Sequence, residues 1–197
     1  MAKFTILFLL SSLLTLSSSI ASLALANGSN TSKFIKTSCS ITRYPSLCIK
    51  SLSEYSSTIQ ESPKQMAQTA LTVSLDRARS VQAFVNQMSK SKGLKKIECQ
   101  VVGDCIENMG DSVDRLGQSI TELEHMGQAK AESFIFHMSN VQTWVSAALT
   151  DEDTCVDGFA GHALDGKLKT AIRARITNVA QVTSNALALI NHFANLV

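Results

Sequence analysis

Apolar residues recur every three or four positions along four long segments of the chain, and this period predicts four amphipathic helices. Three of the segments extend from Pro63 to Met88, from Phe134 to Ala148 and from Asp165 to the C-terminus. No stretch shows the sustained period of two that is typical of strands. The pattern predicts an all-α fold, an up-down-up-down four-helix bundle over residues 63–197. The remaining segment has the strictest alternation of four and three, at Val102, Ile106, Met109, Val113, Leu116, Ile120 and Leu123.

The residues at the predicted helix ends support these boundaries. Ser62 precedes Pro63, and Gln65 follows Ser62 by three residues, so the first helix is expected to have an N-cap, a proline at its first position and a capping box. Gly93 and Gly127 are suited to end the first and second helices.

Three glycines lie beside the apolar seam of the second helix at intervals of seven residues, at Gly103, Gly110 and Gly117. Each glycine costs about 0.5–1 kcal/mol relative to alanine inside a helix. We interpret them as a flat stripe for close approach of another helix, and the alternative is that they are tolerated by chance.

The N-terminus is predicted to be a secretory signal peptide, residues 1–26. Lys3 supplies the positive start, Phe4 to Leu16 form a mainly apolar stretch, and Ala24-Leu25-Ala26 has the spacing of a cleavage site. No later apolar run approaches the length of a membrane span, so we expect no membrane attachment after cleavage. A secreted chain enters an oxidising compartment, and its cysteines are therefore candidates for disulfides.

Residues 27–62 are predicted to form a short helical hairpin appended to the bundle. Cys39 and Cys48 flank Pro45 within this segment, which makes a local disulfide loop plausible. Asn27 and Asn30 each begin an Asn-x-Ser/Thr sequence and are candidate glycosylation sites at the mature N-terminus.

The chain has five cysteines, so at least one is left without a partner in the monomer. In an antiparallel helix pair, the start of the second long helix lies beside the end of the third. Both Cys99 and Cys105 are then near Cys155, and spacing does not choose between them. The cysteines form no C-x-x-C pair and the four histidines are scattered, so no metal site and no cofactor are predicted.

Composition narrows the class of partner. The 197 residues are 45% hydrophobic, and 18 basic residues nearly balance 16 acidic ones for a formal net charge of +2. No stripe of Lys and Arg with interleaved aromatics is present, which argues against a nucleic-acid partner.

The sequence contains no pattern that is typical of an active site. The run Gly110-Asp111-Ser112 resembles the opening of one esterase class, but a nucleophile of that class needs a turn after a strand and Ser112 is inside a predicted helix. Asp151, Glu152 and Asp153 are predicted to form a solvated acidic loop at a helix end. We therefore expect that the chain is not an enzyme.

One polar surface is a candidate for recognition. Glu107, Asp111 and Asp114 are spaced four and three along the second helix, on a face turned away from Met109 and its apolar neighbours. The alternative is an ordinary solvated helix face.

The chain resembles the plant invertase and pectin methylesterase inhibitor family over roughly residues 33–195. The first block is Cys39-x8-Cys48, and the second begins at Gly103-Asp104-Cys105-x-Glu107 and continues through Asp111, Asp114 and Leu116. Further blocks are Trp144-Val145-Ser146-Ala147-Ala148-Leu149-Thr150-Asp151-Glu152-Asp153-Thr154-Cys155 and Ser184-Asn185-Ala186-Leu187-Ala188-Leu189-Ile190.

The resemblance implies a four-helix bundle with an N-terminal helical hairpin and the disulfides Cys39–Cys48 and Cys105–Cys155. The family's usual unpaired cysteine is replaced by Ser184, and Cys99 is extra here. Residues that match the family's contact positions are Glu107, Asp111, Asp114, Thr154 and Asp157.

Within the family, the Ala-Ala-Leu-Thr-x-x-x-Thr-Cys block is more similar to pectin methylesterase inhibitors, and the Pro-Lys-Phe tripeptide common in invertase inhibitors is absent. The resemblance implies a secreted inhibitor in the apoplast (cell wall) that blocks the pectin-binding cleft of pectin methylesterase, with invertase as the alternative target. Carboxylates that face carboxylates of the enzyme predict tighter binding in acid, and carboxylates that face basic groups predict the reverse.

Overall fold

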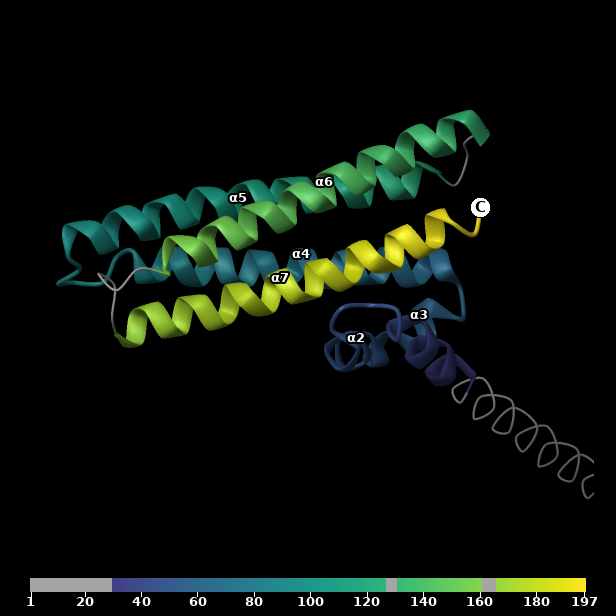
Figure 1. The fold of residues 1–197 in the computed structure, drawn as a ribbon, viewed down its shortest axis with the longest axis horizontal. Coiled ribbons are helices and arrows are strands. Elements are labelled where there is room, and N and C mark those ends of the chain that lie inside the picture. The colour runs from purple at the N-terminus through teal and green to yellow at the C-terminus, as the bar shows by residue number, and fades with distance from the viewer. Residues whose placement is uncertain (1–29, 127–130, 161–165) are drawn as a thin grey trace, which may run out of the picture.

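The computed structural model describes residues 30–126, 131–160 and 166–197. Four long helices lie along one another, with consecutive helices antiparallel (Figure 1). They are α4 (Pro63–Met88), α5 (Lys96–His125), α6 (Ala131–Gly158) and α7 (Lys167–Ala194). Helix α5 packs between α4 and α6, and α7 packs between α6 and α4, so the four helices close a ring. The described residues contain no strand, and the predicted up-down-up-down bundle is confirmed.

The interior face of α5 differs from the predicted seam in one respect. Val102, Met109, Leu116 and Leu123 are fully buried, as the spacing predicts. The buried positions between them are occupied by Cys105, Ser112 and Ser119, whereas Ile106, Val113 and Ile120 pack half-buried at the edge of the core. The apolar period therefore located the helix correctly but rotated its interior face, because it could not count small polar residues as core.

The predicted N-terminal hairpin is present. Residues 30–39 are helical, α2 (Pro45–Leu52) follows, and the disulfide Cys39–Cys48 joins the two with a Cα–Cα distance of 5.6 Å. The short helices η1 (Ser53–Tyr55) and α3 (Ser56–Ile59) lead into α4. Helix α2 packs against α7 and α4, and the hairpin shares one hydrophobic core with the bundle. A division at residue 62 remains a prediction.

The side chain of Asn185 on α7 fixes the hairpin to the bundle. Its amide nitrogen donates to the carbonyl oxygen of Tyr44, and its amide oxygen accepts from the Tyr44 N–H, both at 3.0 Å. Asn185 is itself buried, so these two bonds satisfy a polar group that would be costly to bury alone.

The predicted start of α4 is half confirmed. The Ser62 hydroxyl accepts from the Gln65 N–H at 3.3 Å and caps the helix ahead of Pro63. The reciprocal half of the capping box is not made, because the Ser62 N–H already donates to the Ile59 carbonyl at 2.9 Å. Helix α4 ends at Met88, and Gly93 follows in the left-handed region with φ of 87°.

The glycine stripe does not serve close helix packing in this chain. A Cβ added at Gly103 or Gly117 would meet no atom within 4 Å, and one at Gly110 would meet only the end of the Gln82 side chain, at 3.3 Å. The interpretation as a packing stripe is therefore wrong for Gly103 and Gly117, where a side chain would meet no neighbouring helix, and Gly110 alone approaches a side chain of α4.

The second disulfide joins Cys105 to Cys155, with a Cα–Cα distance of 4.7 Å between α5 and α6, and Cys99 is free and exposed. These bonds are the pairs that the resemblance implies. In the chain-entropy model, a loop of about 50 residues makes such a bond worth about 4 kcal/mol.

We expect Cys105→Ser with Cys155→Ser to lower the free energy of unfolding by about 4 kcal/mol, because the unfolded chain regains the entropy of that loop. Urea unfolding followed by circular dichroism measures the change. Cys99→Ser is the matched control and should leave the midpoint unchanged. A Cys99→Ser variant as unstable as the double variant would contradict the assigned pairing.

Candidate functional site

The five predicted contact residues are all exposed, and they come from two adjacent helices. Glu107, Asp111 and Asp114 are on α5, and Thr154 and Asp157 are on α6. The buried Cys105–Cys155 disulfide joins these neighbouring helices within two residues of Glu107 and Thr154. We call these five residues the α5–α6 surface.

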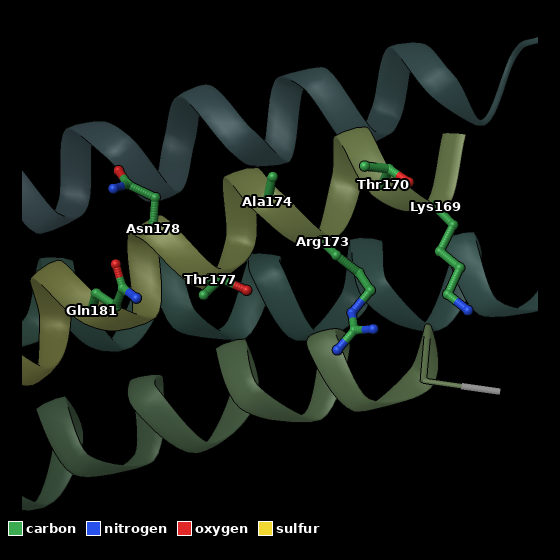
Figure 2. Close-up of a pocket in the computed structure, with 7 residues that line it drawn as sticks. All are labelled: Lys169, Thr170, Arg173, Ala174, Thr177, Asn178 and Gln181. Carbon is green, nitrogen blue, oxygen red and sulfur yellow. The ribbon is translucent and has the colours of Figure 1, made fainter. Parts of the chain in front are cut away.

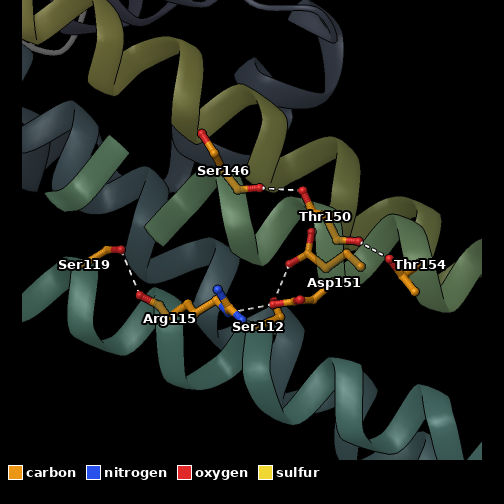
Figure 3. Close-up of polar contacts among 8 residues, drawn as sticks. Ser112, Arg115, Ser119, Ser146, Thr150, Asp151 and Thr154 are labelled. Atoms are coloured by element: carbon orange, nitrogen blue, oxygen red, sulfur yellow. Dashed lines mark hydrogen bonds and ion pairs between the residues drawn. The ribbon is translucent and has the colours of Figure 1, made fainter. Parts of the chain in front are cut away.

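Arg115 and Asp151 connect the two helices beside this surface, and sequence reasoning did not single out Arg115. The Arg115 Nε lies 2.9 Å from the Asp151 Oδ2, but its N–H is not aimed at that oxygen, so the contact is an ion pair without a hydrogen bond. Figure 3 shows the two side chains meeting between α5 and α6. The i, i+4 spacing of Asp111 and Arg115 is the signal that could have identified the arginine.

The local charges act on Asp151 in opposite directions. Partial burial raises the pKa of Asp151, the Arg115 guanidinium lowers it, and the Asp111 carboxylate raises it. The side chain of Asp151 is 15% exposed and that of Arg115 is 38% exposed. At such exposure the ion pair contributes about 0.2–1 kcal/mol, so its main effect is to fix the orientation of both groups.

The threonines of α6 are held by their own helix. The Thr154 hydroxyl donates to the Thr150 carbonyl at 2.7 Å, and the Thr150 hydroxyl donates to the Ser146 carbonyl at 3.1 Å (Figure 3). Each donation uses the single hydroxyl proton and leaves the oxygen lone pairs available. The exposed Thr154 is therefore an acceptor in a fixed position, on a surface that is otherwise rich in carboxylates.

Glu152 corrects a sequence prediction. Residues 151–153 were expected to form a solvated loop at a helix end, but they lie within α6, which continues to Gly158. Glu152 is fully buried, and its Oε1 accepts from Ser112 at 2.7 Å and from Thr183 at 3.0 Å. Glu152 follows Ala148 by four residues and precedes Cys155 by three, so extending the interior period of α6 beyond Ala148 would have placed it in the core.

Burial gives this carboxyl an unusual titration. Loss of hydration raises the pKa of Glu152 to about 8, even though the bonds from Ser112 and Thr183 act to lower it. Its second oxygen, Oε2, has no hydrogen-bond partner. Ser112, the residue of the Gly-Asp-Ser run, is fully buried beside Glu152 and is closed to any substrate.

Two shallow depressions of about 470 and 550 Å³ lie elsewhere, along α7 and between α4 and α7. Figure 2 shows the first of them. None of the five residues of the α5–α6 surface lines either depression. The predicted contact residues therefore lie outside both depressions.

The remaining features to compare with the sequence are metal sites, membrane spans and the two glycosylation candidates. Across the described ranges, no group of three or more His, Cys, Asp or Glu side chains is arranged to hold a metal ion, and no helix has the length and apolar character to span a membrane. Asn30 is exposed, while Asn27 and the predicted signal peptide lie outside the described residues.

The sequence and the fold both match known proteins. The model of the family described as plant invertase/pectin methylesterase inhibitor matches residues 33–189. The chain belongs to this family. The fold is similar to that of a solved structure: a mutant form of a pectin methylesterase inhibitor from Arabidopsis has a TM-score of 0.63 at 18% identity, over 78% of this chain and 92% of the other.

Two sequence relatives are similar over nearly their whole length. Pectinesterase inhibitor 11 of Arabidopsis thaliana is 50% identical over 189 residues, which is 95% of this chain and 94% of the relative. Pectinesterase inhibitor 9 of the same plant is 53% identical over 177 residues, which is 88% of this chain and 87% of the relative. Within the plant invertase/pectin methylesterase inhibitor family, the chain is thus similar to members named as pectinesterase inhibitors.

The buried carboxyl predicts how stability depends on pH. The native pKa of Glu152 is about 8, above its ordinary 4.5, so the native state holds one more proton than the unfolded state between these values. This group therefore makes stability fall as pH rises from about 5 to 8, by up to about 1.4 kcal/mol per pH unit. We expect Glu152→Gln to remove that slope.

Urea unfolding at pH 5, 6, 7 and 8, values that span roughly this window, measures the slope for both proteins. Glu124→Gln is the matched control, because Glu124 is an exposed glutamate that does not contribute to the pKa of Glu152. An unchanged slope in Glu152→Gln would show that Glu152 is ionised in the native state.

Proposed function

We propose that the chain is a proteinaceous inhibitor of plant pectin methylesterase, which it blocks by covering the pectin-binding cleft of the enzyme. The observation that carries this proposal is the rigid, exposed α5–α6 surface, which is held by the Cys105–Cys155 disulfide and the Arg115–Asp151 ion pair. The names of relatives about 50% identical to the chain support the choice of target.

The mechanism is occlusion without chemistry. A surface built on two helices that are already fixed in register loses little conformational entropy on binding, so more of its contact energy appears as affinity. Carboxylates and the Thr154 hydroxyl provide acceptors for donors that line a groove built to bind a polysaccharide. No reacting group of the inhibitor is needed.

The proposed contacts are Glu107, Asp111, Asp114, Thr154 and Asp157. Arg115 is proposed as a positioning residue, because it lies between the carboxylates of α5 and Asp151 of α6. Its guanidinium limits the mutual repulsion of these carboxylates, which would otherwise disfavour their gathering on one surface.

The proposal includes the secretion and processing of the chain. Residues 1–26 are removed as a signal peptide, the mature chain is secreted to the apoplast, and Asn27 and Asn30 are available for glycosylation. The exposed position of Asn30 supports its part of this proposal.

A paired titration tests the target. Increasing amounts of the purified mature chain are added to plant pectin methylesterase and, separately, to plant cell-wall invertase. We expect stoichiometric loss of esterase activity and no change in invertase activity. Slowed invertase with an unaffected esterase would assign the chain to the other branch of its family.

Substitutions on the α5–α6 surface test the contacts. We expect Asp111→Lys, Asp114→Lys and Thr154→Ala each to weaken inhibition by about tenfold or more if they are central contacts, because each removes an acceptor from a desolvated interface. The inhibition constant for the esterase is measured, and far-UV circular dichroism checks that helicity is kept.

Glu124→Lys is the matched control for the two lysine variants. It reverses an exposed carboxylate on the same helix, near the C-terminal end of α5 and away from the disulfide. Equal effects of Glu124→Lys and Asp111→Lys would mean that total charge, and not this surface, determines inhibition.

A further inference from the structure

The two depressions noted above adjoin each other on the opposite pair of helices. The first is lined by α7 residues that include Lys169, Arg173 and Gln181, and the second by residues of α4 and α7 that include Arg77 and Arg175. Both include Ala174 and Asn178, so they meet along one ridge of α7. We call the two adjoining depressions together the α4–α7 groove. Its α7 residues, 169–181, extend over about 18 Å of helix axis.

The lining of the groove is cationic and hydrogen-bonding. The two depressions contain four Lys or Arg residues, several hydroxyl and amide side chains, and no Asp or Glu. The carboxylates of Glu54 and Asp76 line a further depression that shares Arg77 and Ser80 with the second. Figure 2 shows Lys169 and Arg173 extending on the same side of α7, with Asn178 toward another helix. The groove thus presents two pairs of cations, with Lys169 and Arg173 in the first depression and Arg77 and Arg175 in the second, and with neutral donors and acceptors between the pairs.

The arginines of the groove are not neutralised by carboxylates of the described residues. Arg77 donates to the side-chain oxygens of Asn178 and Ser51, each at 2.9 Å, and Arg175 lies over the ring of Phe84 at 4.1 Å from its centroid. Both contacts orient a guanidinium and leave its charge intact. Arg173 forms no ion pair with any of the described residues, whereas Arg115 of α5 pairs with Asp151.

Charge is segregated between the two halves of the bundle. Helices α4 and α7 contain seven Lys or Arg residues and one carboxylate, Asp76. Helices α5 and α6 contain twelve Asp or Glu residues and two Lys or Arg. A net charge of +2 conceals this separation. The two halves are therefore suited to partners of opposite charge.

We propose that the α4–α7 groove binds a linear acidic polysaccharide that carries a carboxylate on each sugar, such as demethylated pectin. Arginine forks match carboxylates in geometry and charge, and hydroxyl and amide side chains match the sugar hydroxyls. The choice of a uronate polymer rests on the proposed function, because removal of methyl esters from pectin by the esterase leaves this polymer.

An elongated groove suits a linear chain better than it suits a membrane. Binding to a lipid surface usually requires large apolar side chains that insert beside the cations. The exposed large hydrophobic residues of the described chain line neither depression of the groove. Because the groove and the α5–α6 surface are on different helix pairs, the polymer and the enzyme can be bound at once.

The test measures polymer binding with no enzyme present. Purified mature chain is subjected to affinity electrophoresis in gels that contain polygalacturonate or highly methylesterified pectin, and it is co-sedimented with anionic phosphatidylserine vesicles. We expect retardation by polygalacturonate that is lost at high salt, little retardation by the esterified polymer, and no co-sedimentation with vesicles.

The variant Lys169→Gln with Arg173→Gln should weaken polygalacturonate binding by about tenfold. The matched control, Lys64→Gln with Arg79→Gln, removes the same charge from α4 at positions that do not line the groove, and it should bind nearly as well as the parent. Circular dichroism verifies that both variants are folded.

Equal loss in the control pair, equal binding of both polymers, or binding to vesicles instead of polygalacturonate would overturn the proposal. The outcome is separable from that of the proposed function. Lys169→Gln with Arg173→Gln should inhibit the esterase as the parent does, whereas a chain that binds polygalacturonate but inhibits no esterase would refute the inhibitor proposal alone.

Discussion

Helices α5 and α6 are held together by small side chains and one covalent bond. Cys105 is bonded to Cys155, and Ser112 donates to Glu152 from the neighbouring interior position of α5. Small residues allow two helix backbones to approach closely, and the disulfide fixes which turn of one helix faces which turn of the other. The register that brings Asp111 and Thr154 onto one surface depends on this pairing, as does the Arg115–Asp151 contact.

Charge segregation gives the bundle two different sides. The carboxylates of α5 and α6 repel one another, and Arg115 offsets part of that repulsion only locally. Electrostatic repulsion that is tolerated in the folded state is typical of a functional surface. The cations of α4 and α7 are on the other helix pair, and Arg77 is held there by neutral contacts with Asn178 and Ser51. The proposed enzyme-binding surface and the proposed polyanion-binding groove are therefore on different helix pairs of one small bundle.

The sequence predicted the helices better than it predicted their interiors. The Ser62–Pro63 pair located the start of α4, and the apolar seam from Val102 to Leu123 lies within α5, because caps and amphipathic spacing act locally. Gly127, the predicted end of the second helix, lies outside the described residues. Half of the interior face of α5 was missed, because Ser112 and Ser119 are small and polar and hydropathy assigns them to the surface, while Cys105 was considered only as a disulfide candidate.

At the candidate site, too, the sequence predicted positions on single helices but not the contacts between helices. The exposed positions of Glu107, Asp111 and Asp114 follow from helical spacing alone. The partnership of Arg115 with Asp151, and that of Ser112 with Glu152, join residues 36 to 40 positions apart in the chain and depend on how two helices pack. The interior period of α6 would have placed Glu152 in the core. Charged residues are mostly exposed, however, so its charge was given more weight than its position and it was assigned to solvent.

The central claim is that the α5–α6 surface covers the enzyme while the α4–α7 side stays open. Hydroxyl-radical footprinting with mass spectrometry, applied to the mature chain alone and in complex with pectin methylesterase, tests it directly. The account predicts that side chains around Asp111 and Thr154 are protected in the complex while those around Arg173 remain as reactive as in the free chain. Protection of α7 with unchanged reactivity on α5 and α6 would contradict it.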